Sequence, residues 1–218
     1  MNKEEQVLRM TKIVSDFVGH VAKVLPDDVQ EKITELANDE RNPLAKTIYA
    51  TMKENMKLAK ELSRPSCQDT GVLQYWVKVG ANYPLLGELE SILRNATYQA
   101  TQETPLRHNC VETFDEYNTG KNIGTLAPYI LWDIVPDRDD VEIFPYMAGG
   151  GCSLPGSGKT LMPGEGYEGV AKFVLDLMTS YGLNACPPLL IGVGVATSID
   201  TAALLSKKAL MRPVSSVA

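Results

Sequence analysis

The hydrophobic period of the chain changes at Arg64–Pro65, and this change constrains the fold more than any other feature. Before it, apolar residues recur at helical spacing, which predicts helices over residues 7–24, 27–39 and 43–62. The third helix is rich in methionine, which fills irregular gaps between helices, so we expect its apolar stripe to face a core. The stripe consists of Leu44, Ile48, Met52, Met56, Ala59 and Leu62.

After this point, segments with strand character alternate with helical ones. Strands are expected at residues 72–80, 129–136, 141–149 and, as a buried strand, 189–196. Helical periodicity returns over residues 84–102, 166–182 and 198–211. The alternation predicts an α/β fold, in which a helical N-terminal lobe (residues 1–62) precedes a mixed β-sheet layer with flanking helices (residues 63–218). We expect both parts to belong to one catalytic domain.

The composition limits the classes of function. The net charge of -6 is spread over many short segments and leaves no basic footprint, which argues against binding to nucleic acid or to an anionic membrane. The N-terminal residues are too polar for a signal peptide, and no apolar run is long enough to span a membrane. We therefore expect a cytoplasmic protein.

The four cysteines are far apart in the sequence and form no CxxC pair, which argues against a zinc ribbon. They are Cys67, Cys110, Cys152 and Cys186. In a reducing compartment such cysteines are free thiols or metal ligands more often than disulfides.

The stretch from Ala148 to Met162 resembles a phosphate-binding loop because it contains Gly-Lys-Thr. A Walker A loop needs a glycine where this chain has Ser153, and the helix that should follow is interrupted by Pro163–Gly164. Nucleotide binding is therefore the weakest hypothesis. Two others remain: a flexible surface turn, or an anion loop in which glycine backbone approaches a small substrate and Lys159 supplies positive charge.

Three consecutive polar residues, Cys67, Gln68 and Asp69, occupy the turn between the third helix and the first strand. A thiolate, an amide and a carboxylate offer a metal ligand, a hydrogen-bonding group and a general acid. The alternative is a structural turn in which the aspartate caps the backbone.

Two further residues are candidates for the same site. Cys186 precedes two prolines, and a thiol held on such a stiff corner suits an iron–sulfur cluster, although an inert buried cysteine fits the pattern equally well. Arg107 opens a polar loop, and its planar guanidinium suits a carboxylate, although a solvated surface arginine is the commoner case.

Taken together, these segments resemble the class I fumarate hydratase and L(+)-tartrate dehydratase family, in its iron–sulfur α subunit. The resemblance covers nearly the whole chain. It is most specific at CQDTG, VKVG, PLRHN, VETFDEYNTGKN, YMAGGGC, LMPGEGYEGV and NACPPLLIGVGVATS.

The resemblance implies a hydro-lyase that reversibly dehydrates a hydroxy-dicarboxylate such as tartrate or malate. In the family, three cysteines hold a 4Fe-4S cluster with one iron open to substrate, and two of them match Cys67 and Cys186. The matching substrate contacts are Gln68, Asp69, Arg107, Gly150 and Lys159, with Asp69 also handling the proton at the substrate hydroxyl.

Family members continue beyond the point where this chain stops, and the third cluster cysteine belongs to that continuation. We therefore expect that this chain alone does not hold a stable cluster and has little activity without further chain. A β subunit or C-terminal domain is the expected partner, in a homo-oligomer of αβ units. The alternative is a non-catalytic, truncated remnant that keeps the fold and binds a β partner.

Overall fold

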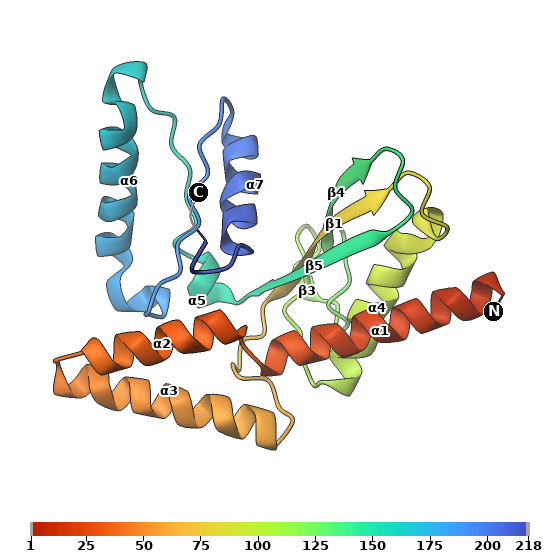
Figure 1. Ribbon diagram of the computed structural model, residues 1–218, viewed down its shortest axis with the longest axis horizontal. Coiled ribbons are helices and arrows are strands. Elements are labelled where there is room, and N and C mark those ends of the chain that lie inside the picture. The colour runs from red at the N-terminus through yellow and green to blue at the C-terminus, as the bar shows by residue number, and fades with distance from the viewer. Residues whose placement is uncertain (1, 217–218) are drawn as a thin grey trace. The chain divides into compact units, whose positions relative to one another are not determined.

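The computed structural model describes residues 2–216 (Figure 1). The chain folds into two compact units, residues 1–148 and residues 149–218. The expected organisation into a lobe of residues 1–62 and a part of residues 63–218 stays a prediction.

The three N-terminal helices form where the hydrophobic period predicts them. They are α1 (Lys3–Lys23), α2 (Asp27–Asp39) and α3 (Pro43–Glu61). A capping box begins α1: the Asn2 side chain accepts from Glu5 N, and the Glu5 carboxylate accepts from Asn2 N. Asn42 caps α3, which has a proline at its first position.

A mixed three-stranded sheet forms the centre of the first unit. Its strands are β1 (Val72–Gly80), β4 (Tyr129–Val135) and β5 (Val141–Ala148), in the order β4-β1-β5. β1 runs parallel to β4 and antiparallel to β5. This confirms the predicted α/β class and its mixed sheet. A second, two-stranded sheet joins β2 (Val111–Glu112) and β3 (Tyr117–Asn118).

The hydrophobic core lies between one face of this sheet and two helices, α1 and α4 (Leu89–Glu103), which pack against each other (Figure 1). Alternate residues of β1 point into it, because successive side chains of a strand face opposite sides. These residues are Leu73, Tyr75, Val77 and Val79, all at most 1% exposed. Burying each such side chain contributes about 2 kcal/mol.

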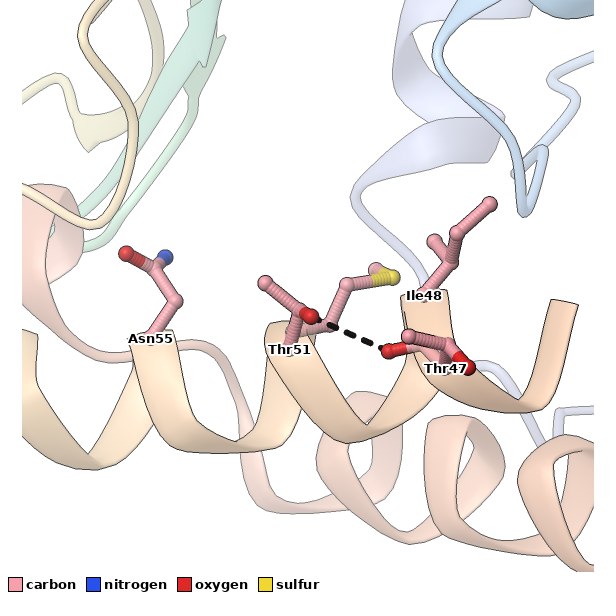
Figure 2. Close-up of a pocket in the computed structure, with 5 residues that line it drawn as sticks. Thr47, Ile48, Thr51 and Asn55 are labelled. Atoms are coloured by element: carbon pink, nitrogen blue, oxygen red, sulfur yellow. Dashed lines mark hydrogen bonds between the residues drawn. The ribbon is translucent and has the colours of Figure 1, made fainter. Parts of the chain in front are cut away.

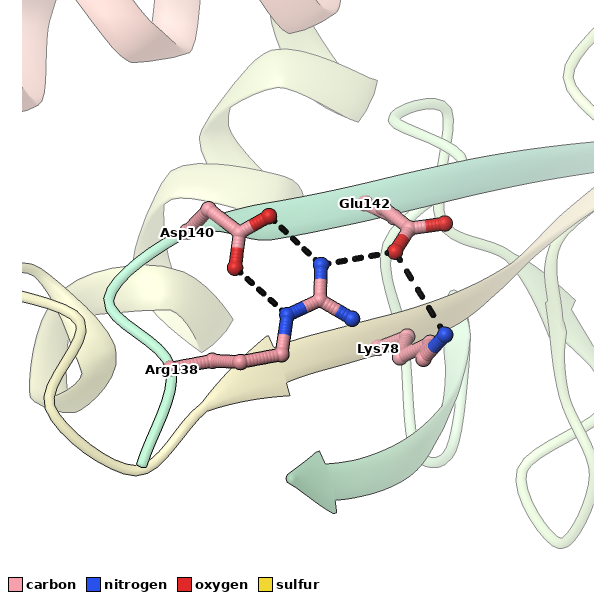
Figure 3. A network of polar contacts seen from close by, with 4 residues as sticks. All are labelled: Lys78, Arg138, Asp140 and Glu142. Carbon is pink, nitrogen blue, oxygen red and sulfur yellow. Dashed lines mark hydrogen bonds and ion pairs between the residues drawn. The ribbon is translucent and has the colours of Figure 1, made fainter. Parts of the chain in front are cut away.

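A polar network closes the turn between β4 and β5 (Figure 3). Arg138 donates to Asp140 Oδ1 at 2.7 Å and to Glu142 Oε1 at 2.8 Å, and Lys78 Nζ lies 3.5 Å from the same glutamate oxygen. Hydrogen bonds from Arg138 lower the pKa of both carboxyl groups, while the two carboxylates raise the pKa of the guanidinium. The network therefore belongs to the structure of the turn.

The prediction that the apolar stripe of α3 faces a core is wrong. Leu44, Ile48 and Leu62 are 71%, 50% and 64% exposed, and among the six stripe residues Ala59 alone is buried. Helical periodicity identifies an apolar face, but does not specify what covers it. A pocket of about 350 Å³ lies along this helix, lined by Thr47, Ile48, Thr51, Met52 and Asn55 (Figure 2).

The second unit is built from helices and extended backbone. It contains α5 (Gly150–Ser153), η2 (Pro163–Glu165), α6 (Gly166–Tyr181), η3 (Gly182–Ala185) and α7 (Ile199–Leu210). Its described residues, 149–216, include no strand. Within residues 2–216, no helix combines the length and apolar character needed to cross a membrane.

The buried strand predicted at residues 189–196 is therefore wrong. The segment has no strand partner, and Val193 and Val195 are 45% and 59% exposed. Two glycines place it against α7 instead: a Cβ on Gly194 would lie 2.0 Å from Ala202 O, and one on Gly192 2.1 Å from Ser206 O. Contact between this backbone and the helix backbone replaces strand pairing.

Candidate functional site

The turn that carries Cys67, Gln68 and Asp69 is anchored to two helices of the first unit. Ser66, directly before it, donates from its backbone N to Ala22 O at 2.9 Å, and its carbonyl accepts from Asn55 Nδ2 at 2.7 Å. Cys67 and Gln68 are exposed, whereas Asp69 is partly buried. The anchored backbone therefore presents the thiol and the amide to the surface.

Gly71 fixes the other end of the turn. Its φ of +78° is a left-handed conformation, and a Cβ there would lie 2.3 Å from the carbonyl carbon of Ala148, the last residue of β5. The Gly71 N–H donates to Asp69 Oδ1 at 3.2 Å. The missing side chain thus lets the two strands meet closely, next to the carboxylate.

Asp69 and Arg107, which lie far apart in the sequence, come together in the first unit. Arg107 Nη1 lies 3.8 Å from Asp69 Oδ2, and the Arg107 N–H donates to Thr70 Oγ1 at 3.0 Å. Asn109 Nδ2 donates to Asp69 Oδ1 at 2.7 Å. The Arg107 side chain is 58% exposed and that of Asp69 27% exposed, so a carboxylate and a guanidinium share one accessible site.

Asn122 holds the loop that carries Arg107 and Asn109, a role that sequence reasoning missed. Its side chain is 1% exposed, accepts from Asn109 N at 2.8 Å, and donates to Arg107 O at 3.0 Å and Thr101 Oγ1 at 3.2 Å. Its φ of +54° is one that asparagine tolerates better than most residues. The available signal was its position in a run of turn-forming residues.

A chain of buried hydroxyl groups extends from Asn122 into the core. Thr101 Oγ1 donates to Thr97 O at 2.7 Å, and Thr97 Oγ1 lies 2.9 Å from the hydroxyl of Tyr75 on β1. Burial raises the pKa of Tyr75 still further above neutral pH than that of an exposed tyrosine. These bonds connect the site loop to the rigid centre of the sheet.

In the second unit, the sulfur of Cys186 lies against the backbone of α5. A Cβ built on Gly151 would be only 2.4 Å from Cys186 Sγ. Gly150 and Cys152 belong to the same helical turn, and both are exposed, as is Cys186. Burial lowers the pKa of Lys207 on α7, and negative charge on the Cys152 sulfur would oppose that shift.

Lys159 lies on an exposed segment with Nζ 3.8 Å from Glu165 Oε1. The next helix of more than one turn, α6, begins only at Gly166. A phosphate loop needs a helix N-terminus directly after the lysine, so the interruption inferred from Pro163–Gly164 is confirmed. The segment lacks the geometry of a nucleotide site.

Two exposed, free cysteines fit the chemistry of an iron–sulfur cluster, because soft thiolates are its usual ligands. Cys67 belongs to the first unit and Cys186 to the second, so their convergence stays a prediction. Between residues 2 and 216, no three His, Cys, Asp or Glu side chains group closely enough to hold a metal ion.

Comparison of the sequence with known proteins shows similarity to one protein family. The family model described as fumarate hydratase (Fumerase) matches residues 11–218. An L(+)-tartrate dehydratase subunit alpha from Escherichia coli K12 is 54% identical over 99% of this chain and 71% of its own length. The protein of that name from Shigella sonnei has the same identity and coverage. A relative from Methanocaldococcus jannaschii, provisionally given this name, is 32% identical over 95% of this chain and 74% of its own length.

The matched residues include the turn with Asp69, the loop with Arg107 and the corner with Cys186. Because one family model spans both units and the identity extends along almost the entire chain, the chain belongs to the fumarate hydratase family.

Proposed function

We propose that this chain is a subunit of an iron–sulfur hydro-lyase that reversibly removes water from a hydroxy-dicarboxylate. The observation that carries the proposal is the pairing of Asp69 and Arg107 beside an exposed cysteine, in a member of this family. A carboxylate that exchanges protons and a guanidinium that binds carboxylates are two of the groups that such a reaction requires.

Cys67 and Cys186 are the residues of this chain that would hold a 4Fe-4S cluster. When bound, the cluster supplies a Lewis acid that weakens the bond between the substrate carbon and its hydroxyl. Both thiols are exposed and neither forms a disulfide, as ligation requires.

Arg107 orients the substrate. Its distance of 3.8 Å from Asp69 is longer than a hydrogen bond, and more than half of its side chain is exposed. The guanidinium can therefore grip a substrate carboxylate with two parallel hydrogen bonds. Gln68, Gly150 and Lys159 complete the proposed set of substrate contacts, the glycine through its backbone.

Asp69 exchanges the proton at the departing hydroxyl. Dehydration breaks a C–H and an adjacent C–O bond: a base, which we propose the β partner supplies, takes the C–H proton, and the leaving hydroxyl needs a proton from Asp69 to depart as water. The hydrogen bonds from Asn109 and Gly71 both reach Oδ1, and this fixes the carboxyl plane while Oδ2 lies on the side of Arg107. Holding the acid in one orientation removes the need to find it by diffusion.

L(+)-tartrate is the substrate we propose first, because relatives above 50% identity carry its name. They are also named subunit alpha, which supports a β subunit as partner, and we propose a homo-oligomer of αβ units. None of the four cysteines, all of them in the described residues, forms a disulfide, which fits a reducing, cytoplasmic location.

The test uses this chain purified with its β subunit and reconstituted anaerobically with iron and sulfide. We expect oxaloacetate to form from L(+)-tartrate, and Asp69→Asn to lower kcat at least about 100-fold. Asp39→Asn, which replaces an exposed aspartate at the end of α2 in the same unit, is the matched control and should leave kcat unchanged. Full activity of Asp69→Asn, or no dehydration of either tartrate or malate, would contradict the proposal.

A further inference from the structure

The Cys186 thiol lies beside Gly151, a glycine for which the proposed function gives no role. A Cβ on Gly151 would lie 2.4 Å from Cys186 Sγ, 3.8 Å from Cys186 Cβ and 3.9 Å from Asn184 O. The first distance is far below the contact distance of carbon and sulfur. The sulfur therefore occupies the space that any side chain at this position would fill.

Backbone geometry gives no other reason for this glycine. Gly151 lies inside the helical turn α5, and it is not among the glycines with positive φ. Alanine is favoured over glycine in a helix by about 1 kcal/mol. Replacing Gly151 with alanine should therefore suit the backbone while removing the space for the sulfur.

Cys186 has little freedom to move away as a whole. Its φ of +55° is a left-handed conformation that is costly for a residue with a side chain, and such strain persists only where the surroundings enforce it. It is preceded by the buried Ala185 and followed by Pro187. Relief must come mainly from rotation about the Cα–Cβ bond, and moving to another staggered rotamer displaces the sulfur by about 3 Å.

We propose that Gly151 is a positioning residue for Cys186: its missing side chain forms a socket that selects the rotamer in which the thiol can bind the cluster. Metal–thiolate distances tolerate about 0.2 Å, so a displaced sulfur is no longer a ligand. The socket itself rests on the geometry alone, whereas its purpose rests on the proposed function of Cys186.

The experiment compares Gly151→Ala with Gly164→Ala in the chain purified with its β subunit. Gly164 is the matched control, because nothing lies within 4 Å of a Cβ there and its φ is not positive. The first measurement is the alkylation rate of each cysteine in the apo protein, followed by peptide mass spectrometry. The second is the iron and sulfide content after anaerobic reconstitution.

In Gly151→Ala we expect alkylation of Cys186 to rise at least about threefold as the sulfur leaves its socket, with Cys67 unchanged. Iron and sulfide content should fall to less than half of the wild-type value, and Gly164→Ala should match the wild type in both measurements. An unchanged alkylation rate of Cys186 would overturn the socket. A changed rate with full cluster content would leave the socket standing and reject Cys186 as a ligand.

A second pair of variants separates positioning from misfolding. With Cys186 present, the clash with the sulfur should make Gly151→Ala lower the melting temperature. In a Cys186→Ala background the sulfur is gone, so adding Gly151→Ala should not lower the melting temperature and should raise it slightly through helix propensity. An equal loss of stability in both backgrounds would mean that the added methyl group clashes with something other than the sulfur, and the proposal would fail.

Discussion

Replacing Asn122 tests whether the site loop depends on one buried amide. The side chain makes three hydrogen bonds, to Asn109 N, Arg107 O and Thr101 Oγ1. Asn122→Ala leaves two backbone groups, the Asn109 N–H and the Arg107 carbonyl, without this partner, next to a position that is itself buried. The threonine hydroxyl keeps its own bond to a helix carbonyl, so it loses less.

The expected cost follows from these contacts. Each buried polar group left without a partner costs about 1–3 kcal/mol, and since Asn109 is only partly buried we take the lower part of this range for two groups, about 3 kcal/mol. Alanine in a left-handed conformation adds about 1 kcal/mol. Asn122→Ala should therefore cost about 4 kcal/mol, and Asn122→Gly, which suits the positive φ, about 3 kcal/mol.

Urea unfolding followed by tryptophan fluorescence measures this cost, since both tryptophans, Trp76 and Trp132, lie on the sheet of the first unit. Asn95→Ala is the matched control: this asparagine is exposed on α4, and its replacement should be neutral or slightly stabilising. Activity should also fall, because Arg107 and Asn109 lose their common anchor. A cost of Asn122→Ala below about 1 kcal/mol would refute the reasoning.

Two further predictions concern the same unit. Gly71→Ala should cost at least about 3 kcal/mol, because a methyl group meets the Ala148 backbone and the positive φ becomes strained; urea unfolding measures it, and a stable variant would contradict the close approach. Arg138→Gln should change how stability depends on pH. Arg138 lowers the pKa values of Asp140 and Glu142 in the folded protein, so its contribution is present above their ordinary values of 3.8 and 4.5 and is lost as the pH falls through the lowered ones. The wild type should be more stable at neutral pH, and the difference should vanish in acid; a constant difference would exclude this linkage.

Elements with a long, regular hydrophobic pattern could be predicted from the sequence alone. The helix at residues 27–39 and the strand at residues 72–80 have the predicted bounds, since their periods of 3.6 and 2 are unambiguous. The short apolar run at 189–196 was misread because such a run fits both a strand and a segment packed on a helix. Its two glycines, read only as strand residues, were the signal of close backbone contact.

Site residues could be predicted from the sequence where a chemically suitable side chain also lies at the end of a helix or strand. Asp69 and Arg107 were identified because each lies in a polar stretch at the end of an element, and the structure brings the two together. Asn109 and Asn122 were missed because asparagine is common in loops, and only tertiary contacts distinguish a buried amide from an exposed one. The glycines of the loop from Ala148 to Met162 were interpreted as backbone that approaches a substrate, whereas the environment of Gly151 points to space for a sulfur.

Each unit organises its own share of the proposed catalytic residues through contacts within itself. In the first, Asn109, Asn122 and Gly71 hold the carboxylate and the guanidinium. In the second, a glycine socket holds a thiol on a strained corner. Side chains fixed in this way lose their freedom when the protein folds, so that cost does not recur when substrate and cluster bind. This explains why residues without chemistry of their own, two asparagines and two glycines, surround the groups that carry it.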